Sequence, residues 1–549
     1  MSIVISPLDT SLSKMWKSIP PYIKVTASSG LIIGLLIHIY VFTNYLPNHD
    51  GMWQVISTID GTTSGRWFSF FPAAISSAFS LPWVNGMLSL VYISVAACFV
   101  VSTLKITNPI ICFLTAGLMV SIPSVTANFC YLYASDASFF GLMLACLAAF
   151  LVSRYKYGFI FAIIPLTLAL GTYQAWYPVT TGILVAWPIM RILRTDIKLK
   201  SIIFDGIKSI IMLAISLVAY LIIVKLTTLT SGLSSYMGIN QIGQIPLSDL
   251  PGLIYRAYSN LFSYFFLNKE GFHYGFMFIL FIIASIVGAI LITRRVHQLG
   301  IIHQPTKLIL LLILLALFPL ACNLIYVMTP LWVHHLMIYG TVLIPIFLLA
   351  VVSLFMKNDV IDRPENKTNA EKVKVNTRAA SSVSSFILNV ERVSVYVVVF
   401  ITVICILNYG ILANKVYFKL NMAYEQTYAQ SVSLVAQAQS VEGYTRQTEI
   451  ILVGQFNNGE VNFYPNLLEL NTISVTGAES SNALLSNWYY DKFIQYFMGI
   501  PNPITSIQSG IVEGGGTAAI IAQMPSYPDR GSVAMINGKI YIKLSDPQQ

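Results

Sequence analysis

The sequence predicts a polytopic α-helical membrane protein with about eleven transmembrane helices and a small C-terminal α+β domain outside the membrane. The chain of 549 residues is 56% hydrophobic and 10% charged, with a mean hydropathy of +0.71, values that soluble globular proteins do not reach. Apolar runs of about 20 residues, the length that crosses a bilayer as a helix, recur through most of the chain. Residues 414–549 instead have an ordinary soluble composition.

The apolar runs fit helices, because the strands of a membrane β-barrel are shorter and alternate strictly. The predicted spans cover residues 25–45, 84–101, 106–124, 137–153, 158–172, 178–193, 209–224, 275–293, 308–327, 336–356 and 393–412. We therefore expect a membrane domain over residues 1–413, with a flexible cytoplasmic linker over residues 357–392 before the last span.

The basic residues predict the orientation. With the N-terminus in the cytoplasm, 21 of the 32 lysines and arginines fall on the cytoplasmic side, as the positive-inside rule requires. The formal charge of +9 is thus a topology signal and does not call for a nucleic-acid partner. The outer side then holds residues 46–83, the turns near residues 133–136 and 173–176, the loop 227–274 and the C-terminal domain.

The C-terminal domain is predicted over residues 414–549. The stretch EIILVGQF (449–456) alternates as a strand, and NWYYDKFIQYFM (487–498) has helical spacing. GSVAMINGKIYIKLS (531–545) predicts a hairpin that turns at Asn537-Gly538.

The first outer loop concentrates ionisable groups in a chain that is poor in them. Asp50 follows the first span, and it is either a solvated loop carboxylate, a helix cap or a substrate contact. Residues 51–59 have helical apolar spacing, which predicts a short helix on the membrane surface that ends at Asp60. Arg66 follows in GTTSGRWF, where it either snorkels to the headgroups or holds a lipid phosphate.

Other outer segments offer further polar groups. Asp136 lies in YLYASD, where helix capping and substrate contact are both open. Gln174, in GTYQAWYP, is a polar amide between short spans and needs a partner there. The loop 255–275 combines Arg256, Lys269 and His273 with many aromatic residues, as a sugar-binding or headgroup-binding surface would, although aromatic residues are common near membranes.

No metal or nucleotide site is expected. The adjacent residues His334 and His335 would point about 100 degrees apart on a helix and could not easily share an ion. The sequence also has no phosphate-binding glycine loop and no nucleophile elbow. Because the polar groups face outward, where nucleotides are scarce, a lipid-carried donor is the natural substrate. We expect no cofactor.

The combination of Asp50 and Asp60, Gly65-Arg66-Trp67, the Tyr173-Gln174 turn and MPSYPDRGSVAMINGKIYIKLS (524–545) resembles the bacterial and phage-encoded O-antigen glucosyltransferases of the serotype-converting Gtr type, glucosyltransferase family II. The resemblance covers nearly the whole chain through short motifs. It implies a fold of the glycosyltransferase superfamily C and a place in the bacterial inner membrane. It also implies an undecaprenyl-phosphate-glucose donor, O-antigen lipopolysaccharide as acceptor at the periplasmic face, and a functionally linked flippase and lipid-glucose synthase.

The family places a catalytic carboxylate in the first outer loop, which implies Asp50 as the base and Asp60 as the reserve. We expect Arg66, with Arg256 and Lys269, to bind the donor phosphate. Substrate contacts are expected from His49, Trp67, Asp136, Tyr173, Gln174 and His273.

Three other functions remain open from the sequence. The chain could transfer another sugar or a sugar phosphate from a similar lipid, which the sequence does not distinguish. A lipid-linked sugar flippase or transporter would require ionisable residues within the spans, where apart from Lys225 almost none occur. The third possible function is that of a scaffold protein that binds glycan without catalysing a reaction.

Overall fold

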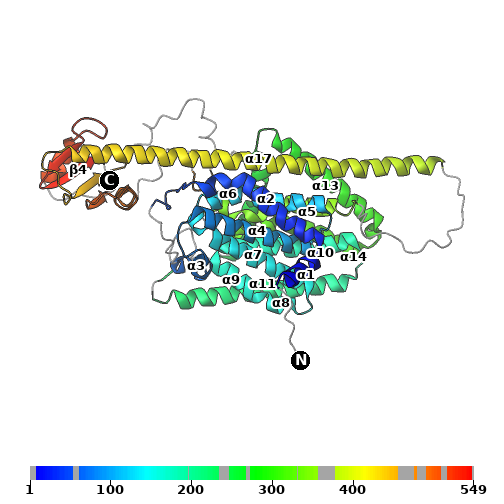
Figure 1. Cartoon of the computed structure of the whole chain (residues 1–549). Helices are drawn as coiled ribbons and strands as arrows, with labels where there is room; N and C mark the ends of the chain where they lie inside the picture. The colour runs from blue at the N-terminus through cyan, green and yellow to red at the C-terminus, as the bar shows by residue number, and fades with distance from the viewer. Residues whose placement is uncertain are drawn as a thin grey trace.

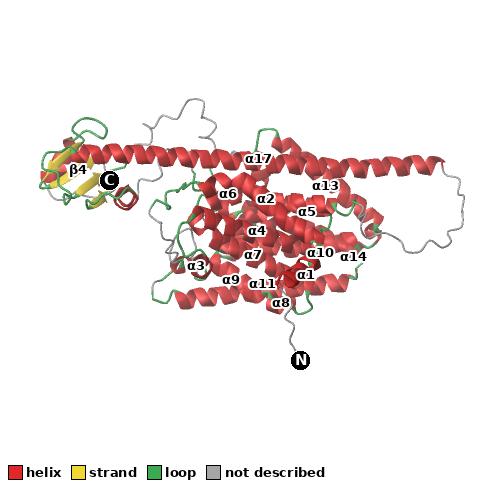
Figure 2. Cartoon of the chain, viewed as in Figure 1, coloured by secondary structure: helices red, strands yellow, loops and turns green. Residues whose placement is uncertain are grey.

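The chain folds as a helical bundle with a small mixed sheet at its C-terminal end (Figures 1 and 2). The computed structural model describes residues 8–52, 61–195, 197–230, 232–233, 246–267, 272–329, 332–356, 378–455, 475–478, 490–507 and 516–546, with backbone alone for residues 8–12 and 378–388.

Seven helices of the described residues are long and apolar enough to cross a membrane. They are α2 (Pro21–Thr43), α4 (Pro82–Thr103), α7 (Leu132–Arg154), α11 (Leu199–Thr227), α13 (Met277–Gln298), α14 (Pro305–Cys322) and the part Asn389–Gln439 of α17 (Arg378–Gln439). An eighth span results if α5 (Pro109–Ser121) and α6 (Pro123–Phe129), which meet at 45°, are counted together.

The predicted count of eleven spans is therefore not confirmed. The segments predicted at 158–172, 178–193 and 336–356 are helical but fall outside this set, because most of their helices are shorter than the membrane is wide and the 18-residue α10 is less apolar, with Arg191 and Arg194 in its last turn. Their helices are α8 (Gly158–Phe161), α9 (Ile163–Thr172), α10 (Tyr177–Arg194) and α16 (Leu343–Val352). The shorter helices elsewhere are α1 (Leu8–Ser18), α3 (Phe70–Ile75), α12 (Leu250–Phe262), α15 (Ile325–Met328), α19 (Tyr490–Lys492) and α20 (Gly516–Gln523).

A buried histidine fixes the break between α5 and α6. His38 of α2 is fully buried, and its Nε2 lies 2.8 Å from the carbonyl oxygen of Val120 at the end of α5. A carbonyl accepts, so Nε2 donates, and Nδ1 therefore accepts from the hydroxyl of Tyr417 in α17 at 2.7 Å. Three helices are held together at the point from which the chain turns into α6.

The C-terminal sheet has the order β2-β1-β4-β3. Strand β1 (Ile450–Val453) pairs in parallel with β2 (Ile504–Ile507) and β4 (Lys539–Lys543), and β3 (Val533–Ile536) pairs antiparallel with β4. The predicted hairpin is confirmed: Asn537 and Gly538 have φ of 50° and 78°, as a two-residue turn of this type needs. The predicted helix 487–498 is present as α19 and a following π-helical turn (Phe493–Phe497) in its described part.

Helix α17 runs along the whole bundle and on to the sheet (Figure 1). It begins at Arg378, within the range predicted as linker, and continues through the predicted domain boundary at residue 413 to Gln439. Side chains of α17 such as Leu434 and Ala438 pack with Ile450 and Ile540 of the sheet in one apolar cluster. The last span therefore continues without a break into the first part of the C-terminal region.

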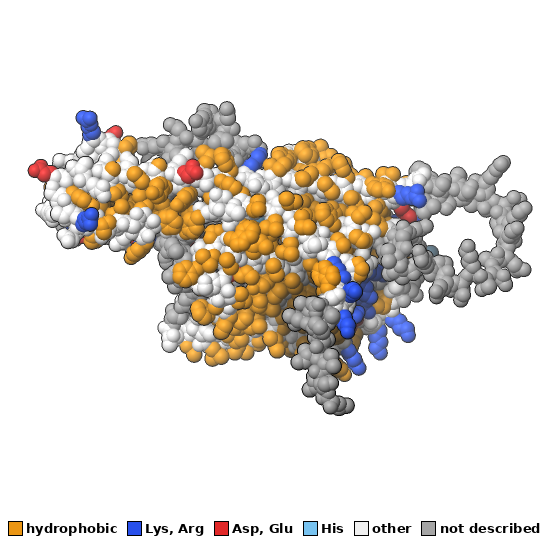
Figure 3. Space-filling model, in the orientation of Figure 1, with side chains coloured by type: hydrophobic (Ala, Val, Ile, Leu, Met, Phe, Trp, Pro, Cys, Tyr) orange, Lys and Arg blue, Asp and Glu red, His pale blue; other side chains and the backbone are white. Residues whose placement is uncertain are grey.

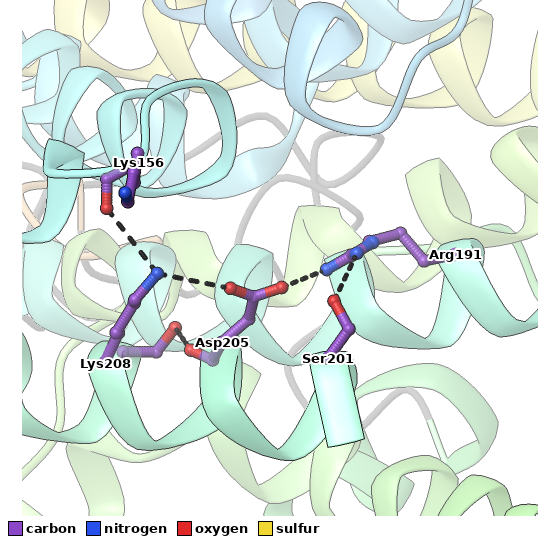
Figure 4. Close-up of polar contacts among 6 residues, drawn as sticks. Lys156, Arg191, Ser201, Asp205 and Lys208 are labelled. Atoms are coloured by element: carbon purple, nitrogen blue, oxygen red, sulfur yellow. Dashed lines mark hydrogen bonds and ion pairs between the residues drawn. The ribbon is translucent and has the colours of Figure 1, made fainter. Parts of the chain in front are cut away.

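Most lysine and arginine side chains visible in Figure 3 gather at the end of the bundle that carries α1 and α14, away from the C-terminal region. One cluster at this end holds α10 against α11 (Figure 4). Asp205 of α11 pairs with Arg191 of α10, and Lys208 lies 3.7 Å from the same carboxylate. Lys208 also lies 3.5 Å from the carbonyl oxygen of Lys156, and Arg191 donates to Ser201 at 3.3 Å.

Candidate functional site

A tight turn after α2 presents the predicted base. Asn48 is 1% exposed, and its Oδ1 accepts a hydrogen bond from the backbone amide of Gly51 at 2.9 Å. The amide of Met52 lies 3.2 Å from the carbonyl oxygen of Asn48. His49 and Asp50 occupy the middle of this turn, with side chains 36% and 34% exposed and 3.7 Å between Nε2 and the carboxylate. The turn thus directs a partly accessible carboxylate away from the bundle core.

The turn is also anchored on the C-terminal region. Met52 is 1% exposed within the apolar cluster of the sheet, and Tyr45 stacks on Phe497 with 5.2 Å between ring centroids. Burial raises the pKa of Tyr45 to about 12, so its phenol stays protonated and donates to the carbonyl oxygen of Gly51 at 2.8 Å. The backbone around Asp50 is therefore held from both sides.

A second loop positions Arg66. The short helix η1 (Thr62–Ser64) ends at Gly65, whose φ of +73° is a conformation that favours glycine. The amide of Arg66 then donates back to the carbonyl oxygen of Gly61 at 2.7 Å. The two glycines of GTTSGRWF thus close a compact loop.

Gln174 holds this loop in place. Its Nε2 donates to the carbonyl oxygen of Ser64 at 2.9 Å and to the hydroxyl of Tyr220 in α11 at 2.7 Å. The neighbouring ring of Tyr173 lies under Arg66, with Cζ 4.6 Å from the ring centroid, a cation–π geometry. The Nε of Arg66 is buried without a hydrogen-bond partner among the described residues. The guanidinium is thus oriented by a ring and keeps a donor for a ligand.

These side chains line one cavity of about 460 Å³. Its walls come from the turn after α2, the Arg66 loop, the α6–α7 corner, the α9–α10 turn, residues 325–329 and 334–337, and Thr476. The lining residues include His49, Asp50, Arg66, Ser69, Asn128, Tyr131, Tyr133, Ser138, Tyr173, Gln174, His334 and Thr476. Five of the predicted site residues, His49, Asp50, Arg66, Tyr173 and Gln174, are brought together here.

The C-terminal region contributes to this cavity. Thr476 lines it, and the Oγ1 and backbone amide of Thr476 each lie 3.1 Å from Nδ1 of His335. The amide of His335 in turn donates to Oγ1 of Thr476 at 3.1 Å. This reciprocal contact attaches the turn Val475–Ala478 to the cavity wall.

Two predicted contacts lie behind the cavity wall. Asp136 is 1% exposed and faces Ser76 and Asn85, although its neighbours Ser135 and Ala137 line the cavity. Trp67 packs against Gly171 at the end of α9, where a Cβ on the glycine would lie 2.6 Å from the indole. Neither side chain reaches the cavity surface.

The remaining predicted residues lie elsewhere or outside the described residues. Arg256 of α12 lines a second cavity of about 210 Å³ and does not join Arg66. His273 is 6% exposed, with Nε2 3.0 Å from the carbonyl oxygen of Tyr264, and burial lowers its pKa to about 4. Asp60, Lys269 and the surface helix predicted over 51–59 lie wholly or almost wholly outside the described residues.

Several cavity residues were not predicted from the sequence, among them Tyr131, His334 and Thr476. Tyr131 lies in the quoted stretch YLYASD but gave no chemical signal, and its ring meets His49 edge-on at 5.9 Å. For His334 the sequence suggests only metal binding, which its spacing argues against. Thr476 is separated from the other lining residues by more than a hundred positions, and no local pattern connects it to them. Across the described residues, no group of three or more His, Cys, Asp or Glu side chains is placed to hold a metal ion.

The arrangement combines a general-base candidate with an anion-binding group in a partly enclosed space. A carboxylate can take a proton from a hydroxyl, and a guanidinium can stabilise a developing phosphate charge. Polar groups on the surrounding walls can orient a polyhydroxylated ligand.

Comparison with known proteins assigns the chemistry to a family. The family model described as Glucosyl transferase GtrII matches residues 39–345, more than half of the chain. The match includes all the cavity residues except Thr476. No curated protein and no solved structure matches the chain.

Proposed function

Because the chain belongs to the GtrII glucosyl transferase family, we propose that it transfers a glucosyl residue from undecaprenyl-phosphate-glucose to O-antigen lipopolysaccharide at the periplasmic face of the bacterial inner membrane. The observation that carries this proposal is the cavity shared by Asp50 and Arg66. A carboxylate and a cation in one space at the end of a membrane helix suit a donor whose sugar is linked through a phosphate to a lipid.

The proposed reaction is a single displacement with inversion. Asp50 accepts the proton of an acceptor hydroxyl while that oxygen forms a bond to the anomeric carbon of glucose. The bond from the anomeric carbon to the phosphate oxygen breaks, and polyprenyl phosphate leaves with the bonding electrons. Arg66 stabilises the departing phosphate, which is already a good leaving group and needs no general acid. Tyr173 and Gln174 hold Arg66 and its loop in position.

The charge distribution supports the proposed orientation. The basic side chains gather at the end of the bundle opposite the C-terminal region, and cytoplasmic ends of membrane proteins are enriched in such residues (Figure 3). Thr476 of the C-terminal region lines the cavity, so both belong to the other end, which we assign to the periplasm.

Substitution of Asp50 tests the proposal. Asp50→Asn removes the base but keeps the side chain's shape, and we expect transfer to fall by about 10²- to 10⁴-fold. The measurement is incorporation of radiolabelled glucose from undecaprenyl-phosphate-glucose into O-antigen by the purified protein in liposomes.

Asp249→Asn is the matched control, because Asp249 is exposed and lines neither cavity. Asp60→Asn is measured in parallel as the reserve base. Transfer at the wild-type rate by both Asp50→Asn and Asp60→Asn would refute the proposed mechanism. Absence of transfer by the wild-type protein would refute the proposed substrates.

A further inference from the structure

The second cavity has a different chemical character from the first. It lies between α12 with the turn after it, the end of α14 and the segment 332–341, with a volume of about 210 Å³. Its polar lining residues include Arg256, Asn260, Ser263, Asn323 and Thr341, and among the described residues no carboxylate lines it. Rings of Tyr264, Phe272, Tyr326 and Trp332 complete the walls.

One residue that lines this cavity, Asn323, carries a buried hydrogen-bond acceptor without a partner among the described residues. Asn323 is 1% exposed, and its Nδ2 donates to the carbonyl oxygen of Ala257 at 2.8 Å, which fixes the orientation of the amide. Its Oδ1 is buried without a hydrogen-bond partner among the described residues. An unsatisfied buried acceptor is costly, so this oxygen calls for a donor on a ligand.

The unsatisfied oxygen of Asn323 favours a sugar over a phosphate as the ligand of this cavity. A phosphate ionised at neutral pH mainly accepts hydrogen bonds, so it leaves the amide oxygen unsatisfied and adds repulsion. A sugar hydroxyl can both donate and accept, so sugar hydroxyls suit an amide oxygen such as Oδ1 of Asn323 as well as a guanidinium such as that of Arg256. The guanidinium of Arg256 already lies 5.3 Å from the ring centroid of Tyr326 and 3.5 Å from the carbonyl oxygen of Thr329. Aromatic walls favour the apolar face of a sugar ring.

One segment forms the wall between the two cavities. Thr329, His334 and Leu336 line the first cavity, whereas Tyr326, His335 and Ile338 line the second. His335 is the residue held by Thr476 of the C-terminal region. Described residues of this one segment therefore line both the second cavity and the cavity that contains Asp50 and Arg66.

We propose that the second cavity binds one neutral sugar residue of the acceptor glycan, so that an adjoining residue presents its hydroxyl to the first cavity. This inference rests on the proposed function and adds the acceptor subsite to it. It also gives Arg256 a role in acceptor binding, separate from the donor phosphate.

The test separates acceptor binding from donor binding. Trp332→Ala removes a ring that is 71% exposed, so folding is preserved, and Asn323→Leu removes the buried acceptor. The full-length protein in detergent is titrated with O-polysaccharide released from lipopolysaccharide by mild acid, and binding is measured by calorimetry. We expect each variant to bind about tenfold more weakly, as the loss of one such contact predicts. In the transfer assay the KM for acceptor should rise while the KM for donor stays constant.

Trp83→Ala is the matched control, because Trp83 is 50% exposed at the start of α4 and lines neither cavity. Trp332→Tyr should restore most of the binding. Unchanged O-polysaccharide binding by both Trp332→Ala and Asn323→Leu would overturn the inference, as would displacement of the glycan by inorganic phosphate. Because calorimetry needs no turnover, a binding loss in a protein that transfers no glucose would support the subsite while refuting the proposed donor chemistry.

Discussion

Among the site residues, Arg66 has the surroundings that most clearly indicate a role in binding the donor phosphate. Its guanidinium lies on the ring of Tyr173 and keeps a buried Nε donor without a partner among the described residues. Lysine keeps the charge at this position but loses the planar donor fork. We expect Arg66→Lys to lower kcat/KM about tenfold and Arg66→Met to lower it about 10²- to 10³-fold.

Transfer kinetics against donor concentration measure this effect. Arg446→Met serves as control, because Arg446 is exposed in the C-terminal region. Wild-type kcat/KM in Arg66→Met would show that the guanidinium does not stabilise the leaving phosphate.

His273 predicts a pH dependence of stability. Burial lowers its pKa to about 4, below the 6.5 of an exposed histidine, so between these values the unfolded chain binds more protons than the folded chain. The stability contribution is therefore lost as pH falls from about 6.5 towards 4, by about 2 kcal/mol at pH 5.

Thermal unfolding of wild type and His273→Gln at pH 7.5 and pH 5 checks this. Glutamine retains a donor for the carbonyl oxygen of Tyr264 and does not titrate, so the variant should lose less stability on acidification. The exposed His303 gives the control His303→Gln. An equal loss in wild type and His273→Gln would contradict the burial argument.

Individual site residues were predictable where charge stands out against an apolar sequence. Asp50 and Arg66 were found this way, and the structure places both on one cavity. Asp136 carried the same signal, but its carboxylate faces the helix packing instead. Asn323 and Thr476 gave no signal, because their placement depends on contacts between distant parts of the chain.

The Arg66 loop is the element on which the site depends most. A Cβ at Gly65 would lie 2.5 Å from the hydroxyl of Tyr220 and 2.9 Å from Nε2 of Gln174, and φ is +73°. Gly65→Ala should therefore cost about 1 to 3 kcal/mol in stability and displace Arg66, with a larger loss of transfer than of folded protein. Transfer rate and thermal unfolding of the same preparation measure the two effects.

Gly232→Ala is the matched control, because Gly232 has φ of +70° and no described atom outside its chain neighbours would lie within 4 Å of an added Cβ. This control separates the effect of backbone strain from the effect of the steric clash with Tyr220 and Gln174. Equal transfer by Gly65→Ala and Gly232→Ala would show that the contact with Gln174 and Tyr220 does not position Arg66.

Elements with local signals were predicted well. Asn537-Gly538 specifies its hairpin turn, and the apolar runs specify the longest helices. The predicted span 106–124 covers α5 but only the start of α6, because the turn into α6 depends on the contacts that His38 makes with Val120 and Tyr417 across three separate helices. The sequence predicts only residues 393–412 as a span, whereas α17 extends from Arg378 to Gln439. The apolar signal ends near residue 412, but the helix continues through a more polar stretch.

At the scale of the whole molecule, the C-terminal region and the bundle form one site. Met52 joins the turn after α2 to the apolar cluster of the sheet, and Thr476 joins the cavity wall through His335. Composition predicted two regions on the two sides of residue 413. It could not predict that the second region completes a cavity of the first, because such contacts leave no periodic pattern in either segment.

The most direct measurement is an electron cryomicroscopy structure of the wild-type protein with undecaprenyl-phosphate-glucose bound. The proposed mechanism predicts the phosphate against the guanidinium of Arg66 and the anomeric carbon facing the carboxylate of Asp50, within the cavity of about 460 Å³. A donor phosphate bound beside Arg256, or at the basic end near Lys208, would contradict it.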